Sequence, residues 1–506
     1  MTTSYSDDQT PASVPRLSKS KFLAGLQCHK RLYLEFTHPE LAEPPDPSTQ
    51  ALLVMGTEIG LLAQQRFPGG VLVSPGLRPR DAAIAQTAKL LCDPNVPAIF
   101  EGAFEYDNVV VRVDILERIR EAEGQHGGWR LIEVKSSTRV KDVHLSDLAI
   151  QRHVLTGAGL DIVGSCVMHI DTGYQYGGGE IDLKELFAID DVSPAVVERQ
   201  QRVGEQLAAM KSIFLQPQPP AIEPDERCHS PYDCPFWSHC TKDKPARWIY
   251  RLPGPKKVVQ QLAQEGITII DDIPNAVNLS TNQRRVKDNV EWVSPGLGDV
   301  LQSVGYPVHH LDFETVMLAV PRFPRMKPYQ SIPVQWSNHI ELASGEIIHH
   351  EFLHGEATEP RKQWAERLIE SLGEEGTIVV YSSYEEAMMR QVAEAFPELR
   401  QAFKKIIARL WDLYPVLKEH YYHPSFEGSY SIKSVLPVMV PELSYRDLSI
   451  QEGAQAASEY YRMVFVENDW IEQLRIKDAL LEYCARDTMA MVRLRRALKE
   501  KATASV

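Results

Sequence analysis

The sequence predicts a protein built from several α/β domains, and three observations lead to this prediction. The chain has 506 residues, too many for one hydrophobic core and enough for about three domains. Apolar residues make up 43% of the chain and charged residues 24%, which is typical of a soluble globular protein. Two separate stretches alternate apolar strand patterns with amphipathic helix patterns, as expected of α/β folds.

The first α/β stretch follows a polar segment, residues 1–15, whose Ser, Thr, Asp and Pro content predicts a disordered tail. Beyond it, apolar residues at helical spacing predict helices, and β-branched or alternating runs predict strands. Helices are expected over residues 17–34, 51–67, 81–91, 143–155 and 193–214, and strands over residues 98–106, 109–118, 129–136 and 162–170.

The second α/β stretch begins near Val308. Strands are expected over residues 309–314, 332–338, 347–353 and 377–381, with a helix over residues 360–372. Between the two stretches, residues 248–274 combine two turn signals with a short amphipathic helix. This pattern predicts a helical connector, either a plain linker or one that touches a nucleic-acid backbone.

Charge and hydropathy exclude some classes of function. A net charge of −14 argues against a protein that coats nucleic acid through bulk positive charge. An acidic metal-dependent nuclease remains compatible, because bound cations reverse the local field. No apolar run approaches the length of a membrane span, and the start of the chain lacks a signal peptide's apolar core. A cytoplasmic location without membrane contact is therefore expected.

A first group of polar residues falls on two neighbouring strand patterns. Glu133 and Lys135 lie two residues apart on one strand, so their side chains share a face. Asp114 lies in the preceding strand, and the polar segment between the strands is long enough to let them pair antiparallel. That pairing would place Asp114 beside Glu133. Two carboxylates and an ammonium suit a divalent metal ion, phosphate oxygens and an attacking water, whereas a surface ion pair is the alternative.

A second signal comes from the cysteines, of which the chain has 7. Structural disulfides are not expected in a cytoplasmic protein. Cys228, Cys234 and Cys240 recur with five residues between neighbours, and Cys28 is the best candidate for a fourth thiolate. The wide spacing with one remote ligand favours an iron–sulfur cluster over zinc. His229 and His239 remain alternative ligands, and free buried thiols are the other interpretation.

The order of these motifs resembles the RecB-like branch of the PD-(D/E)XK nucleases, over about residues 17–245. The similarity is greatest to members that carry a 4Fe–4S cluster. It implies that Asp114 and Glu133 bind Mg²⁺ or Mn²⁺, that Lys135 positions water or stabilises charge, and that Gln151 lies on the following helix. It also implies that Cys28, Cys228, Cys234 and Cys240 hold the cluster and close the domain. Family members often carry a metal-binding His on an early helix, where this chain has Gly60; Glu58 is a candidate replacement.

A second acidic group lies in the C-terminal stretch. Asp312 and Glu314 share a face of one expected strand. Tyr483 and Asp487 stand four residues apart in a helical pattern and so reach the same point. Glu385 follows a buried strand at a strand-to-helix corner, a frequent site location in α/β sheets.

These acidic motifs resemble the DnaQ-like exonucleases of the ribonuclease H fold, over about residues 305–500. The resemblance implies that Asp312, Glu314, Glu385 and Asp487 are metal ligands and that Tyr483 orients the attacking water. The second motif departs from the family pattern, so Glu386 and Asp412 compete with Glu385 for this place. Lys433, in the segment 428–433, is expected either to contact a substrate backbone or to lie in a solvated loop.

These observations predict a tail (1–15), a restriction-endonuclease-like PD-(D/E)XK domain (16–245), a helical connector (246–304) and a ribonuclease H-like domain (305–500). The expected function is that of a metal-dependent nuclease, in the form of an exonuclease, that acts on DNA in preference to RNA with Mg²⁺ or Mn²⁺ and a 4Fe–4S cluster. The sequence contains no GxxxxGK[ST] loop, so a helicase, repair or defence protein is a conceivable partner. The alternatives are a nucleic-acid-binding or assembly protein with inert sites, and a zinc-bound scaffold.

Overall fold

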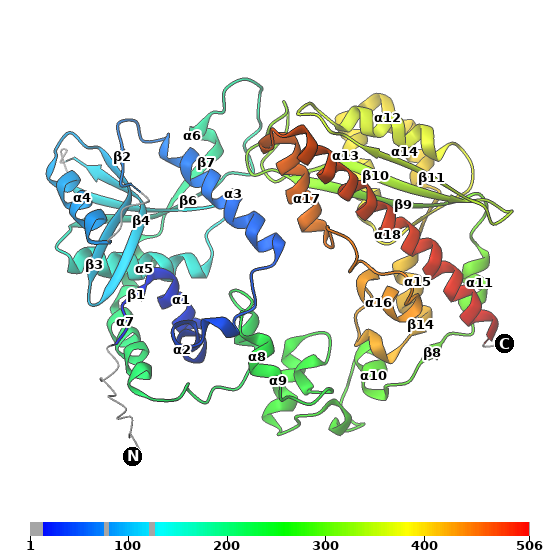
Figure 1. Cartoon of the computed structure of the whole chain (residues 1–506), viewed down its shortest axis with the longest axis horizontal. Coiled ribbons are helices and arrows are strands. Elements are labelled where there is room, and N and C mark those ends of the chain that lie inside the picture. Colours follow the sequence, from blue (N-terminus) through cyan, green and yellow to red (C-terminus); the bar gives the residue numbers. More distant parts are fainter. Residues whose placement is uncertain (1–13, 75–79, 121–126, 505–506) are drawn as a thin grey trace, which may run out of the picture. The chain divides into compact units, whose positions relative to one another are not determined.

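The computed structural model describes residues 14–74, 80–120 and 127–504. It divides into two compact units, each with its own sheet and helices (Figure 1). The N-terminal unit comprises Met1–Asp243 and Ala319–Pro328, and the C-terminal unit comprises Lys244–Leu318 and Tyr329–Val506. The tail expected at residues 1–15 lies outside the described residues except for its last two. Residues 246–304, expected to form a separate connector, group with the C-terminal unit.

The N-terminal unit is built on a mixed sheet with the strand order β2-β3-β4-β5-β6-β7, and β1 pairs with β4. The pairs β3–β4 and β4–β5 are antiparallel, whereas β5–β6 is parallel. The strands are β1 (Leu17–Ser18), β2 (Val71–Leu72), β3 (Ala98–Tyr106), β4 (Val109–Ile119), β5 (Gly128–Lys135), β6 (Ile162–Ile170) and β7 (Phe187–Asp191).

The helices of this unit differ from the expectation at one place that matters for the cysteines. A single helix was expected over residues 17–34, but Cys28 has extended backbone angles, ends α1 and precedes α2. The helices are α1 (Lys19–Gln27), α2 (His29–Thr37), α3 (Pro47–Gln64), α4 (Arg80–Cys92), α5 (Asp142–Gly157), α6 (Leu183–Leu186), α7 (Ser193–Ser212) and α8 (Trp237–Thr241).

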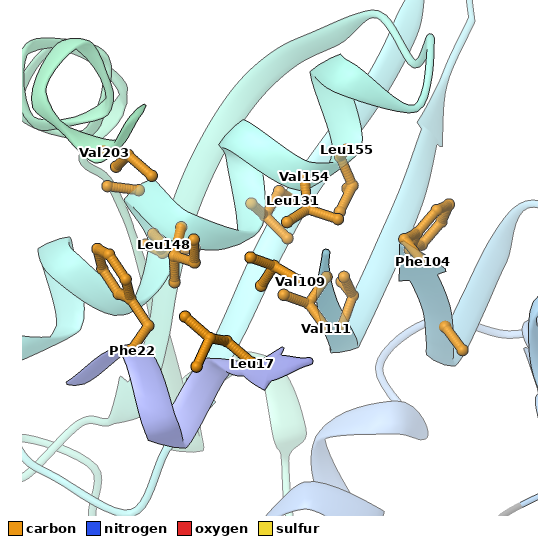
Figure 2. Close-up of a cluster of buried hydrophobic side chains, with 14 of the residues drawn as sticks. Leu17, Phe22, Phe104, Val109, Val111, Leu131, Leu148, Val154, Leu155 and Val203 are labelled. Atoms are coloured by element: carbon orange, nitrogen blue, oxygen red, sulfur yellow. The ribbon is translucent and has the colours of Figure 1, made fainter. Parts of the chain in front are cut away.

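The core of the N-terminal unit lies between the sheet and α5. Val111 on β4 and Leu131 on β5 are buried against Leu148 of α5, and Phe22 of α1 joins the same cluster (Figure 2). Leu131 and Glu133 are two residues apart on β5 and therefore share this helix-covered face. Glu133 thus extends a hydrophobic surface, which explains why this residue is only 1% exposed.

The C-terminal unit is built on a sheet with the order β11-β10-β9-β12-β13. β9, β10 and β11 are antiparallel neighbours, while β12 and β13 run parallel to β9. The strands of the unit are β8 (Trp292–Val293), β9 (Val308–Met317), β10 (Ser331–Glu341), β11 (Ile347–Leu353), β12 (Thr377–Val380), β13 (Leu410–Asp412) and β14 (Tyr421–Tyr422).

Helices cover both faces of this sheet. Leu311 and Phe313 of β9 pack in a hydrophobic cluster with Trp364 of α12. Asp312 points to the opposite face, where the thiol of Cys484 on α18 lies 3.9 Å from its carboxylate. The helices are α9 (Lys256–Gln264), α10 (Thr281–Asp288), α11 (Leu297–Gln302), α12 (Arg361–Leu372), α13 (Tyr384–Ala395), α14 (Arg400–Ile407), α15 (Leu413–His420), α16 (Ile432–Met439), α17 (Gly453–Tyr461) and α18 (Trp470–Ala504).

None of the helices in the described part of the chain combines the length and the apolarity needed to cross a membrane.

Candidate active sites

The first candidate site lies where β4 and β5 meet in the N-terminal unit. The register pairs Ile115 with Ile132, so the next residues along each strand, Asp114 and Glu133, lie side by side. The amide of Val134 donates a hydrogen bond of 2.8 Å to Oδ2 of Asp114. The structure therefore brings together the two carboxylates that the sequence analysis singled out.

Two lysines hold Glu133. Lys135 donates to Oε1 of Glu133 at 2.6 Å, and Lys19 donates to the same oxygen at 2.8 Å. Asp147 of α5 accepts from Lys135 at 2.7 Å and lies 3.4 Å from the ammonium of Lys19. Sequence reasoning missed Lys19 and Asp147. Asp147 could have been found, because it stands one helical turn before Gln151, but Lys19 has no local signal.

Gln151 joins this network from α5. Its Nε2 donates to Oε2 of Glu133 at 2.6 Å and to Oδ1 of Asp147 at 3.1 Å. Its Oε1 is buried and has no hydrogen-bond partner among the described residues. An unpaired buried oxygen is unusual, and the amide oxygen is a ligand type that hard divalent ions accept.

The two neighbouring carboxylates differ in acidity. Burial and the charge of Glu133 raise the pKa of Asp114 to about 7, against the opposing effect of Lys19 and Lys135. Burial would also raise the pKa of Glu133, but Lys135 and Lys19 outweigh it and lower that pKa. Near neutral pH, Glu133 is therefore ionised while Asp114 is partly protonated.

Glu58, the candidate replacement for the missing histidine ligand, does not lie on the buried side of its helix. Gly60 lies on α3, and a Cβ added there would meet nothing within 4 Å. Glu58 is exposed, whereas Ile59 beside it is buried. The inward surface of α3 thus carries Ile59 and not Glu58.

The four cysteines singled out in the sequence influence one another electrostatically. Burial raises the pKa of Cys228, Cys234 and Cys240, and the charge of Cys28 raises each of them further. The amide of Cys234 donates to the carbonyl of Cys228 at 2.7 Å. A soft-metal or iron–sulfur site at these four thiols stays a prediction, and the group of possible metal ligands found among the described residues consists of carboxylates.

The surroundings of these thiols tie α1 to the segment around Cys228–Cys240. Gln27 donates to the carbonyls of Arg227 and Tyr232 at 2.6 and 2.7 Å. Leu34 and Phe236 are buried beside the thiols. The Nδ1 of His229, an alternative ligand in the sequence analysis, lies 2.6 Å from Oδ1 of Asp233.

The second candidate site lies in the C-terminal unit between β9 and α18. One ligand oxygen from each of Asp312, Glu314 and Asp487 lies within 4.8 Å of the other two. Asp312 and Glu314 come from the face of β9 opposite its hydrophobic cluster, and Asp487 comes from α18. Three converging carboxylates are the donor set that Mg²⁺ and Mn²⁺ prefer.

Glu385 is the fourth acidic group near this site. It is buried at the start of α13 and accepts a 3.1 Å hydrogen bond from Ser382, and its charge raises the pKa of Asp312 and Glu314. Glu386, by contrast, forms an ion pair with Arg390 on the helix surface. Asp412 caps α15 through a 2.9 Å hydrogen bond from the amide of Tyr414. Glu385 is therefore better placed than either alternative.

Burial and mutual repulsion raise the pKa values of the carboxyl groups in this site. Burial and the charge of Asp487 raise the pKa of both Asp312 and Glu314 well above their usual range. Burial raises the pKa of Glu385 to about 7 and that of Asp487 to about 6. Such a group loses its protons readily when a divalent cation neutralises the repulsion.

Two tyrosines and a lysine surround Asp487. Hydrogen bonds from Tyr445 and Tyr483 lower its pKa and partly offset the effect of burial. The ammonium of Lys433 lies 5.7 Å from the ring of Tyr445 and 5.5 Å from that of Tyr483, and it donates to the carbonyl of Gln451 at 2.6 Å. Lys433 lies in the first turn of α16 rather than in a loop. Sequence reasoning missed Tyr445, which belongs to a segment without regular structure.

A comparison with protein-family models gives a match within the C-terminal unit. Residues 309–431 match a family model described as a domain of unknown function, DUF2779. No curated protein matches the chain. The matched range contains Asp312, Glu314 and Glu385 and ends before Asp487, so it covers most of the sheet of the C-terminal unit and only part of its acidic site.

Proposed function

We propose that this chain is a metal-dependent nuclease that hydrolyses phosphodiester bonds, with DNA favoured over RNA. The observation that carries the proposal is the convergence of Asp312, Glu314 and Asp487 within 4.8 Å from two separate elements. A buried group of like charges is unfavourable by itself, and a divalent cation removes that repulsion.

The topology of the C-terminal unit supports a ribonuclease H-like fold for this domain. Its sheet combines three antiparallel strands with two that run parallel to the first of them. The acidic pair lies on β9, the first strand, as expected for a DnaQ-like exonuclease. Asp487 and Tyr483 on α18 supply the last motif of that family.

The arrangement of the N-terminal unit supports a PD-(D/E)XK domain. Asp114 lies on β4, Glu133 and Lys135 lie on β5, and Gln151 lies on the helix that follows. The Gln151 oxygen without a partner and the carboxylate of Asp114 would bind the cation together with Glu133. We assign this unit a second hydrolytic site.

In the C-terminal site, Asp312, Glu314, Glu385 and Asp487 would hold Mg²⁺ or Mn²⁺. Bound divalent ions lower the pKa of a coordinated water and neutralise charge on the phosphate. The protein's own groups complete the site. Tyr483 and Tyr445 fix the orientation of Asp487, and Lys433 supplies a positive charge for a phosphate oxygen of the substrate.

We propose a structural role for the cysteines. Cys28, Cys228, Cys234 and Cys240 would ligate a 4Fe–4S cluster that joins the first helices of the N-terminal unit to its last segment.

The function is tested with labelled single- and double-stranded DNA and RNA in the presence of Mn²⁺. The parent chain is compared with Glu133→Gln, Asp312→Asn and the double variant, and Glu117→Gln on β4 serves as a matched control. Loss of cleavage in Asp312→Asn identifies the C-terminal site, and further loss in the double variant identifies the N-terminal one. If the double variant cleaves as fast as the parent, both assignments are wrong; binding without cleavage by the parent favours an inert nucleic-acid-binding protein.

A further inference from the structure

Lys19 occupies a place in the N-terminal site that its sequence position does not suggest. Its ammonium donates to Oε1 of Glu133 and lies 3.4 Å from Asp147. The side chain is 24% exposed, and the two carboxylates that it contacts are 2% and 4% exposed. Lys19 therefore acts as a cation held against two buried carboxylates.

The position of Lys19 is fixed from both ends of α1. Lys19 is the first residue of this helix, which Ser18 caps by accepting from the amide of Lys21 at 3.3 Å. At the other end, Gln27 holds two carbonyls of the segment that contains the clustered cysteines. Phe22, between them, is buried in the core. The helix α1 is roughly 13 Å long. Because both of its ends are held, Lys19 cannot move away from Glu133 unless contacts along this whole length break.

The two candidate sites differ in charge when their acidic groups are ionised. The N-terminal site combines three carboxylates with two ammonium groups, Asp114, Glu133 and Asp147 with Lys19 and Lys135, so one negative charge remains. The C-terminal site combines four carboxylates with one ammonium group, Asp312, Glu314, Glu385 and Asp487 with Lys433, so three negative charges remain.

We propose that Lys19 stands in place of a second metal ion, so that the N-terminal site takes one divalent cation, in contrast to the two ions expected of a DnaQ-like site in the C-terminal unit. This inference rests on the proposed nuclease function. One divalent ion changes the charge of the N-terminal site from minus one to plus one, whereas two would leave plus three in a largely buried site. Two divalent ions bring the C-terminal site to the same plus one. Each loaded site then complements the single negative charge of a phosphodiester.

Lys19 is thus a positioning residue: it fixes Glu133 and sets how many cations the site accepts. Lys21 offers a matched control, since it lies on the same helix and forms a similar 2.9 Å ion pair, but with Glu35. Arginine at position 19 keeps the charge and serves as the conservative variant, whereas glutamine removes it.

The test counts Mn²⁺ ions bound to the full-length chain by calorimetry and by electron paramagnetic resonance. Asp312→Asn combined with Asp487→Asn disables the C-terminal site, and one ion per chain should remain. Adding Lys19→Gln should tighten Mn²⁺ binding to the N-terminal site at least about tenfold or admit a second ion, because a repelling charge is removed. Lys19→Arg and Lys21→Gln should bind one ion with the parent affinity.

Two bound ions in the N-terminal site of the parent background would overturn the inference, as would a folded Lys19→Gln variant with unchanged stoichiometry and affinity. Circular dichroism shows whether Lys19→Gln is folded. If it is not, the number of Mn²⁺ ions bound to the parent background and to Lys19→Arg still tests the inference. A parent chain that binds no Mn²⁺ at either site contradicts the proposed function itself.

Discussion

Asp312 and Asp487 come from a central strand and from the last helix of the chain, yet their carboxylate oxygens lie within 4.8 Å of each other. Both side chains are buried, and burial raises the pKa of each carboxyl group. Under the proposed function, a cation held between these two carboxylates would stabilise only the folded arrangement, so its binding would be coupled to the folding of the C-terminal unit.

The first prediction concerns metal-dependent stability. In a Glu133→Gln background, which removes the N-terminal site, each Mn²⁺ ion at about one hundred times its dissociation constant should stabilise the C-terminal unit by about 2.7 kcal/mol. Asp487→Asn should abolish most of this stabilisation, since the site loses a charged ligand. Differential scanning calorimetry with and without Mn²⁺ measures the effect. Equal Mn²⁺-induced shifts in parent and variant would show that the ion binds elsewhere.

A second prediction concerns pH in metal-free buffer. The pKa of Asp487 rises to about 6 in the folded chain, so the folded state binds this proton more tightly than the unfolded state. The contribution of Asp487 to stability is therefore complete below about pH 4 and is lost as the pH rises toward 6. Asp487→Asn should match the parent near pH 4 and exceed its free energy of unfolding by up to about 3 kcal/mol at pH 7.5. Urea titrations across this range provide the measurement.

Alternation along strands accounts for what the sequence could predict. The faces of β5 and β9 follow from the spacing of Glu133 with Lys135 and of Asp312 with Glu314, and the structure brings their expected partners, Asp114 and Asp487, to them. Local spacing suffices there because one strand or one helical turn fixes which side chains share a face.

Residues that reach a site from unrelated segments could not be predicted in this way. Lys19 and Glu133 are 114 positions apart, and their contact depends on how α1 packs against α5. Tyr445 reaches Asp487 from a segment without regular structure, where no periodicity indicates a direction. The break of the first helix at Cys28 also escaped the pattern, because the apolar spacing of α1 continues into α2.

The third prediction separates the two adjacent glutamates of α13. Glu385→Gln should lower DNA cleavage by the C-terminal site at least about a hundredfold, corresponding to roughly 2.7 kcal/mol of lost transition-state stabilisation. Glu386→Gln should leave it unchanged, since Glu386 pairs with Arg390 on the surface. The assay uses a Glu133→Gln background, so that the other site does not contribute. A larger effect of Glu386→Gln would reverse the assignment.

The fourth prediction concerns the lysine-bound carboxylate of the N-terminal unit. Glu133→Ala removes one of the two carboxylates that Lys19 and Lys135 share in a largely buried site, Asp147 being the other, and it should destabilise this unit by about 3 kcal/mol. Glu117→Ala breaks the ion pair with Arg130 on the same sheet, which is partly exposed, and should cost about 1 kcal/mol or less. Thermal unfolding of both variants gives the comparison. Similar losses in the two variants would mean that Glu133 lies in a solvated pair.

The fifth prediction concerns the cysteines. The anaerobically purified parent chain should be brown and should absorb at about 400 nm, as expected of a thiolate-bound cluster. It should contain about four iron and four sulfide ions per chain. Cys240→Ala should lose both the colour and the iron, since it removes one of four ligands. Cys92→Ala should keep them, because Cys92 is an exposed thiol on α4. Stoichiometric zinc in place of iron, or full iron retention in Cys240→Ala, would contradict the assignment of these four thiols to an iron–sulfur cluster.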